Sequence, residues 1–236
     1  MKLINYLLII IITIPSSTVI FKVSAEEVWV ITSLNWQPYS GAEIINQGNS
    51  IQKLRNILKK EKIELLVEFH PWKRSQAKAK SKEYIGYFPA WPEEVSKGFI
   101  ASPAIDWSEI AVMKQSQKSI SFKDIDELFQ KYKVGVVRTY TYPKVIEDAM
   151  KKYPHNVDST MSEVSLLKKL SSGRHPVAIT DPGVMQYLAD KEGISNIEFV
   201  KNITAKELVI ALRDDADNKK RIQLLHKLLS DKVQPQ

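Results

Sequence analysis

The sequence contains no cysteine among its 236 residues. Disulfide bonds, a thiol nucleophile and a lipid attached to a lipoprotein cysteine are therefore excluded, and packing alone must stabilise the fold. Catalytic motifs are scarce as well. The four histidines lie apart, without the spacing of a metal site, and there is neither a Gly-x-Ser-x-Gly elbow nor a glycine-rich phosphate loop. We therefore expect no metal and no cofactor.

Long apolar runs are missing too. The run that follows Lys2 is interrupted at Pro15–Thr18, so it is shorter than the roughly 20 residues that span a bilayer. A basic residue, an apolar segment and the small-x-small sequence Val23–Ala25 are together typical of a secretory signal peptide. We predict a signal peptide over residues 1–25, cleaved after Ala25, and a periplasmic location. The alternative is an uncleaved membrane anchor.

The chain carries only a mild excess of positive charge. Cleavage would leave 211 of the 236 residues, enough for one large domain or two small lobes. Loss of Lys2 and Lys22 would lower the formal net charge from +7 to +5. In an exported protein so small a basic excess does not indicate nucleic acid. It is compatible with attraction to anionic ligands or surfaces, or with no functional role.

The hydrophobic pattern of the first half predicts strands that alternate with helices. The expected strands are Glu27–Leu34, Ile63–Phe69 and Tyr84–Phe88, and the expected helices are Ile51–Leu58, begun by capping residues at Gly48–Ser50, and Trp72–Lys80. This order implies a parallel sheet covered by helices. An extended stretch at Ser108–Lys114 then leads to a linker at Gln115–Ser121.

The same order then begins again. Helices are expected over Ile125–Tyr132, Val145–Met150 and Val164–Leu170, and strands over Lys133–Val137 and Pro176–Thr180, followed by strands at Ile197–Val200 and Glu207–Leu212 and a helix at Ile222–Leu229. Two α/β units joined by extended chain would leave a cleft between them. Ligands in such folds bind where the parallel strands end.

The order of six segments resembles the family 3 extracellular solute-binding proteins, the periplasmic receptors of amino-acid-type ABC importers. These segments are NWQPYSG (35–41), PWKRSQAKA (71–79), YIGYFPAWPEE (84–94), FIASPAIDWSEIAVM (99–113), KVGVVRTYTYP (133–143) and VAITDPG (177–183). The resemblance implies a bilobed α/β fold of the periplasmic-binding-protein type II, with two lobes joined by two crossing strands. Lobe 1 would comprise residues 26–112 and 205–236, and lobe 2 residues 113–204.

In lobe 1, the resemblance implies that aromatic side chains contact the ligand. Trp36 and Tyr39 lie in the loop after the first strand, although they could instead only cover the end of the sheet. Trp72 and Arg74 begin the next helix, where an arginine could pair with a ligand carboxylate. Arg74 also belongs to a basic stretch that could simply face solvent. Trp91 completes an expected apolar clamp.

One segment departs from the family. Members that bind amino acids have an arginine that grips the ligand carboxylate, and here Glu93 or Glu94 stands at that place. A glutamate would repel a ligand carboxylate instead of pairing with it. The departure argues against a standard α-amino acid as the ligand.

In lobe 2, Arg138 and Thr139 begin a turn that continues through Tyr140 and Thr141, where hydroxyls and backbone N–H groups could form an anion site. Alternatively, Thr141 only caps the following helix. Asp181 matches the acidic residue that holds the ligand ammonium in amino-acid receptors. It also precedes Pro182 at a helix start and could serve only as the N-cap.

We therefore predict a monomeric periplasmic solute-binding protein that closes on a small polar or aromatic-bearing, amino-acid-like ligand. Closure would bend the chain at Ala111–Lys114 and Ile203–Lys206, and an ABC permease or the outer domain of a sensor kinase would recognise the closed form. One alternative is a periplasmic enzyme resembling the cyclohexadienyl dehydratases, with Glu93, Glu94 or Asp181 as acids. Another is an orphan lobe pair, a protein of the same fold that has lost its small ligand and acts by contact with other proteins.

Overall fold

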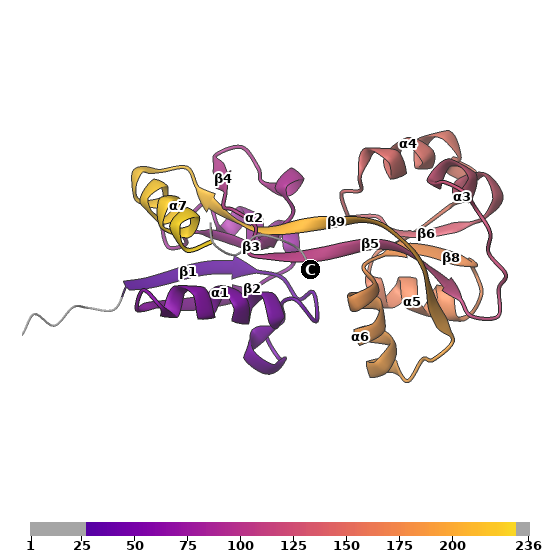
Figure 1. Ribbon diagram of the computed structural model, residues 1–236, viewed down its shortest axis with the longest axis horizontal. Helices are drawn as coiled ribbons and strands as arrows, with labels where there is room; N and C mark the ends of the chain where they lie inside the picture. The colour runs from indigo at the N-terminus through magenta and orange to yellow at the C-terminus, as the bar shows by residue number, and fades with distance from the viewer. Residues whose placement is uncertain (1–26, 230–236) are drawn as a thin grey trace, which may run out of the picture.

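The computed structural model describes residues 27–229. The predicted signal peptide and its cleavage site lie outside this range. Two lobes stand side by side, and the strands β5 and β9 run through both of them (Figure 1). Within the described range, no helix combines the length and apolar character needed to cross a membrane.

Lobe 1 is built on a sheet whose first three strands are parallel, as predicted. Its elements are β1 (Glu27–Ser33), η1 (Ile45–Gln47), α1 (Asn49–Lys59), β2 (Ile63–Phe69), α2 (Trp72–Lys78), β3 (Gly86–Ala90), η2 (Pro92–Glu94), β4 (Phe99–Ala101) and α7 (Ala216–Leu229). β1 pairs in parallel with β2 on one side and β3 on the other, while β3 and β4 pair antiparallel with β9. The sheet is therefore mixed.

The start of α1 differs from the expectation of a side-chain cap. The N-cap is Gly48, with φ at 106°, and no side chain caps the helix. A Cβ there would lie 2.4 Å from the carbonyl oxygen of Tyr39, so only glycine fits. Ser50 instead donates to Asp106 Oδ2 at 2.7 Å. The backbone N–H of Ser50 donates to the carbonyl oxygen of Tyr39 at 3.0 Å, which holds the loop that carries Tyr39 against the helix.

Lobe 2 repeats the alternation of strands and helices. Its elements are α3 (Ile125–Lys131), β6 (Val134–Val137), α4 (Lys144–Lys152), η3 (Pro154–Asn156), β7 (Val157–Thr160), α5 (Glu163–Ser171), β8 (Val177–Thr180) and α6 (Pro182–Glu192). β6 pairs in parallel with β7 and β8. Figure 1 shows α3 and α4 on one side of this sheet and α5 and α6 on the other. β7 and β4 were not expected, because both are short.

The two crossing strands correct a further expectation. Ile197–Val200 and Glu207–Leu212 are not separate strands but parts of one 17-residue strand, β9 (Ile197–Arg213). β9 runs antiparallel to β5 (Asp106–Gln115), and β5 pairs with β8 over Ala111–Lys114. The predicted bend at Ala111–Lys114 therefore falls inside the lobe 2 sheet, and the crossing lies nearer the start of β5.

Both lobes have buried apolar cores, and the central strands supply much of them. Trp29 and Ile31 of β1 are fully buried with Leu54 of α1, while Val136 of β6 is fully buried with Leu128 of α3. The strand order β2-β1-β3-β9-β5-β8-β6-β7 makes these sheets continuous. The loops after the parallel strands of each lobe therefore face one another across the crossing.

Candidate ligand-binding site

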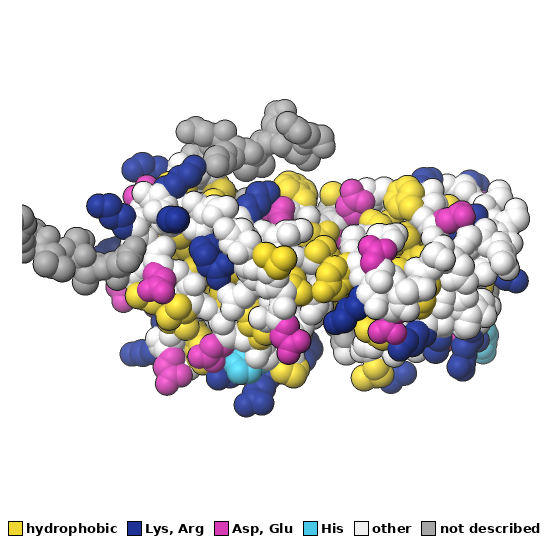
Figure 2. All heavy atoms as spheres, turned by 90° about the horizontal axis from the view of Figure 1, so that it is seen from below, with side chains coloured by type: hydrophobic (Ala, Val, Ile, Leu, Met, Phe, Trp, Pro, Cys, Tyr) yellow, Lys and Arg dark blue, Asp and Glu magenta, His cyan; other side chains and the backbone are white. Residues whose placement is uncertain are grey.

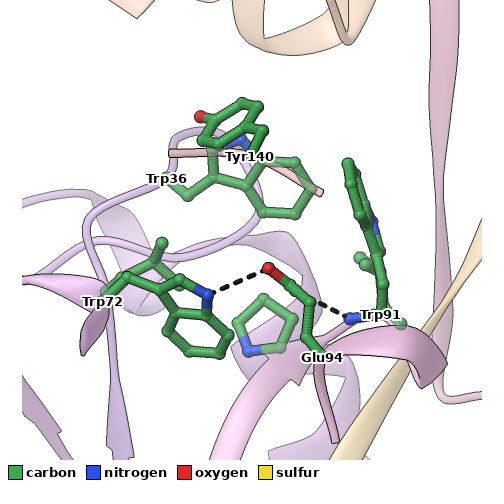
Figure 3. A pocket seen from close by; sticks show the side chains of 8 residues that line it. Trp36, Trp72, Trp91, Glu94 and Tyr140 are labelled. Carbon is green, nitrogen blue, oxygen red and sulfur yellow. Dashed lines mark hydrogen bonds between the residues drawn. The ribbon is translucent and has the colours of Figure 1, made fainter. Parts of the chain in front are cut away.

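A pocket with a cavity volume of about 30 Å³, or about 370 Å³ when its open mouth is counted, lies where the two lobes face each other. Three tryptophans and one tyrosine form most of its wall (Figure 3). Trp36 follows β1, Trp72 begins α2, Trp91 follows β3, and Tyr140 follows β6 of lobe 2. The other lining residues are Leu34, Pro89, Glu94 and Leu208. Seen from below, the surface is hollowed between the lobes and hydrophobic side chains gather there (Figure 2).

The rings contact one another edge to face. The centroids of Trp36 and Trp91 are 6.3 Å apart at an interplanar angle of 80°, and those of Trp91 and Tyr140 are 6.4 Å apart at 74°. Trp36 is 9% exposed and Trp91 is 7% exposed. The Trp91 indole N–H also donates to Ser108 Oγ at 2.9 Å. Trp36 and Trp91 are therefore held in place by contacts within lobe 1.

Glu94 is the acidic group of this pocket, and it is fixed by two donors. Its Oε1 accepts from the Trp72 indole N–H at 3.0 Å, and its Oε2 accepts from the backbone N–H of Trp91 at 3.1 Å. Burial raises the pKa of Glu94, although these hydrogen bonds and nearby Lys73 oppose the shift. Figure 3 shows the carboxylate between Trp72 and Trp91.

The structure separates the two glutamates that the sequence left as alternatives. Glu93 has a half-exposed side chain and forms an ion pair with Lys206, whereas Glu94 lines the pocket. The cause is the single turn of η2, which directs neighbouring side chains to different sides. Of the two glutamates, Glu94 is therefore the one that lines the pocket.

Tyr39 and Asp181 are brought together across the lobes. The Tyr39 hydroxyl donates to Asp181 Oδ2 at 2.8 Å, and Tyr39 lies against Trp36 with ring centroids 4.6 Å apart. Asp181 also accepts from the backbone N–H groups of Glu109 and Val184, both at 2.9 Å. It is 4% exposed, and burial raises its pKa. Asp181 thus caps α6, as one alternative proposed, and ties the two lobes together.

Three predicted polar contacts lie elsewhere. Arg74 and Arg138 are exposed, and neither is among the described residues that line the pocket. Along α2, Trp72 lines the pocket while Ser75 is fully buried, which leaves Arg74 on the solvent side. Thr139 is exposed at the rim of a second hollow. Thr141 does not cap α4, because Pro143 occupies the N-cap position.

The second hollow adjoins the first and reaches deeper into lobe 2. It has a cavity volume of about 440 Å³, or about 1040 Å³ with its open mouth, and shares Leu34, Trp36, Trp72 and Tyr140 with the first. Glu163, at the start of α5, lines it and accepts from Thr180 Oγ1 at 2.8 Å. Burial raises the pKa of Glu163 to about 7, even though hydrogen bonds from Thr180 and Tyr140 oppose the shift.

Sequence reasoning missed Glu163 and treated Tyr140 only as one hydroxyl of an anion site. The ring of Tyr140 lines the pocket, and its pKa is raised well above the usual value by burial and by Glu163. An aromatic residue inside the Arg138–Pro143 segment was the signal that could have found it. Nothing in the local sequence distinguishes Glu163 from a glutamate in the first turn of any helix.

No protein-family model matches the chain, and no curated protein matches it by sequence. Solved structures do match. A histidine kinase sensor domain with similarity to periplasmic binding proteins superposes with a TM-score of 0.69 at 15% identity, covering 87% of this chain and 90% of that one. An ancestral arginine-binding protein bound to arginine gives 0.68 at 17% identity, covering 86% and 91%.

The substrate-binding protein of an amino acid ABC transporter gives a TM-score of 0.63 at 16% identity, covering 86% of this chain and 92% of that one. At such identities the likeness shows the fold. The chain has the bilobed α/β fold of the periplasmic binding proteins, and the fold implied by the resemblance to the family 3 solute-binding proteins is confirmed.

Proposed function

We propose that the protein is a periplasmic solute receptor that closes its lobes on a small organic ligand held among Trp36, Trp72, Trp91 and Tyr140. One observation carries this proposal. The pocket takes three aromatic walls from lobe 1 and one from lobe 2, so it is complete only when the lobes meet. A ligand that contacts all four rings binds the closed form more tightly and shifts the equilibrium towards it.

The proposed contacts differ from the full set that the sequence suggested. Trp36, Trp72 and Trp91 are retained, and Thr139 is a contact for a ligand that extends into the second hollow. Tyr39 and Asp181 are proposed as a latch between the lobes, because Asp181 is already hydrogen-bonded by three donors. Arg74 and Arg138 are left out, since both face solvent.

The closed form would be recognised by a membrane partner. The structural neighbours include the substrate-binding protein of an ABC transporter and the sensor domain of a histidine kinase, so their fold serves both import and sensing. An ABC permease and a sensor kinase are accordingly the two partner classes that we propose for this chain, which would act as a monomer without catalysis.

A thermal-shift screen with a metabolite library tests the receptor function. A ligand present at 100 times its Kd stabilises the protein by about 2.7 kcal/mol, a readily measured rise in Tm. The rise should be lost in Trp36→Ala and kept in Trp107→Ala, because Trp107 lines neither hollow. Nuclear magnetic resonance of the ligand after incubation should show it unchanged. Turnover would favour the dehydratase-like enzyme, and no shift with any metabolite would favour the orphan lobe pair.

A further inference from the structure

The walls of the pocket have a chemistry that selects among ligands. Trp36, Trp72, Trp91 and Tyr140 present ring systems, and the faces of such rings carry negative electrostatic potential. A cation within about 6 Å of a ring centroid is attracted to it, most strongly over tryptophan. Alkyl groups attached to the charged atom gain from burial against the same rings. Neutral apolar ligands would gain only the second of these contributions.

Glu94 adds a full negative charge to these rings. Its two hydrogen bonds to Trp72 and Trp91 fix its position, and each carboxylate oxygen keeps a further lone pair for a ligand donor. A charge-assisted bond to a fixed, partly buried carboxylate is stronger than a neutral hydrogen bond. The position suits an ammonium group enclosed by rings.

The only charged residue that lines the pocket, among those the structure describes, is acidic, although Lys73 and Lys206 lie beside it. Among the described residues that line it, none is basic. The cations and titratable groups that face Glu94 from neighbouring elements are Lys73 of α2, Glu93 of η2 and Tyr140 of lobe 2. Lys206 of β9 lies over Trp91, 6.0 Å from its ring centroid, and is paired with Glu93. A ligand carboxylate in the pocket would meet Glu94 with no lining base to compensate it.

Building on the proposed receptor function, we propose that the ligand is a small organic cation, an amine or a quaternary ammonium ion, enclosed by Trp36, Trp72 and Trp91 and neutralised by Glu94. Because burial raises the pKa of Glu94, a bound cation must lower it again. Affinity for the cation should therefore increase as the pH rises through that pKa.

Calorimetry with matched probes tests the inference. Choline is compared with 3,3-dimethyl-1-butanol, its neutral isostere, and benzylamine with benzyl alcohol; benzoate serves as the anion. We expect each cation to bind at least about ten-fold more tightly than its neutral partner, and benzoate to bind most weakly. Glu94→Gln should remove most of the difference, whereas Glu93→Gln should leave it within about two-fold, because Glu93 lies outside the pocket.

Glu94→Gln keeps an acceptor oxygen for only one of the two donors, Trp72 Nε1 and Trp91 N, so unchanged binding of the neutral probes is the check that the walls are intact. The inference is overturned if the neutral probes or benzoate bind as well as the cations, if no cation binds, or if Glu94→Gln leaves the preference unchanged. A neutral or anionic metabolite whose binding is lost in Trp36→Ala would overturn the inference and leave the receptor function standing. Failure of every metabolite to bind would remove the receptor function itself.

Discussion

Lobe 1 holds its part of the pocket with side chains that support one another, whereas lobe 2 reaches the pocket from a loop. Trp36 and Trp91 are nearly buried and in contact, and Trp72 is tied to the same Glu94 as the Trp91 backbone. Tyr140 lies between Thr139 and Thr141, which are both exposed. For the proposed receptor, this difference predicts that lobe 1 selects the ligand and that lobe 2 completes the site when the lobes close.

The largest effect should come from removing a lobe 1 ring. We expect Trp36→Ala to weaken binding of the identified ligand by about 3 kcal/mol, because a preorganised tryptophan at the centre of an interface is a typical hot spot. Tyr140→Ala should cost about 1 kcal/mol, since its wall forms only on closure. Calorimetry measures both, and equal losses would contradict the division between the lobes.

A control on folding accompanies this pair. Both variants should keep a cooperative thermal transition, because each side chain lines the pocket, although Trp36 also belongs to the buried apolar core and Tyr140 packs against it. Loss of the cooperative melt in Trp36→Ala would make Trp36 a core residue, and the proposed ligand contact would fail for that position.

The next effect concerns the charge on the lobe 2 side. Burial raises the folded-state pKa of Glu163 to about 7, above its ordinary value near 4.5. For a carboxyl with a raised pKa, the folded state binds more protons than the unfolded state between these values, so its contribution to stability falls as the pH rises from about 4.5 to about 7. Glu163→Gln imitates the protonated form. The free energy of unfolding of the variant, relative to that of wild type, should therefore be about 2 kcal/mol higher at pH 8 than at pH 5.

Urea denaturation of both proteins at the two pH values measures this gain. Equal midpoint changes in wild type and variant would show that Glu163 does not titrate in this range. Glu163 would then not be a buried acid of the second hollow whose charge depends on pH.

A smaller effect is expected at the latch between the lobes. Tyr39→Phe removes the hydroxyl that donates to Asp181 but leaves the two backbone donors that fix this carboxylate. We expect ligand affinity to fall by about 1 kcal/mol, because one interlobe hydrogen bond that favours closure is lost. Small-angle scattering should show a larger radius of gyration for the unliganded variant.

Tyr153→Phe provides the matched control for the latch. Its hydroxyl also donates to an aspartate, Asp126 at 3.0 Å, but both residues belong to lobe 2. Neither affinity nor radius should change. The same loss in both variants would mean that the Tyr39 hydroxyl acts on stability and not on closure.

The order of strands and helices could be predicted from the sequence because hydrophobic periodicity is a local property. That Trp36, Trp72 and Trp91 lie at the ends of strands could be predicted as well, and they line one pocket, but their contact with a ligand stays a prediction. β7 was not predicted because Val157–Thr160 is short and partly polar. The continuity of β9 was not predicted because its middle part, Lys201–Lys206, is mostly polar. Pairing with β5 is what extends the strand through this part.

The polar half of the site could not be predicted for a different reason. Whether Glu93 or Glu94 faces the pocket depends on the rotation of one 3-10 turn, and the exposure of Arg74 depends on the register of a two-turn helix. Asp181 is held by Tyr39 and Glu109, which are distant in the sequence. Such choices follow from tertiary packing and leave no local signal.

The smallest effect should be at Arg138, where sequence and structure make opposite predictions. The turn after β6 suggested an anion site in which Arg138 adds positive charge, but its side chain is exposed and does not line the pocket within residues 27–229. We expect Arg138→Ala to change ligand affinity by less than about 0.5 kcal/mol, the usual range for an exposed residue away from a site. A ten-fold loss in calorimetry would restore Arg138 as a contact. It would also mean that lobe 2 selects ligand charge, so that the two lobes share the selection.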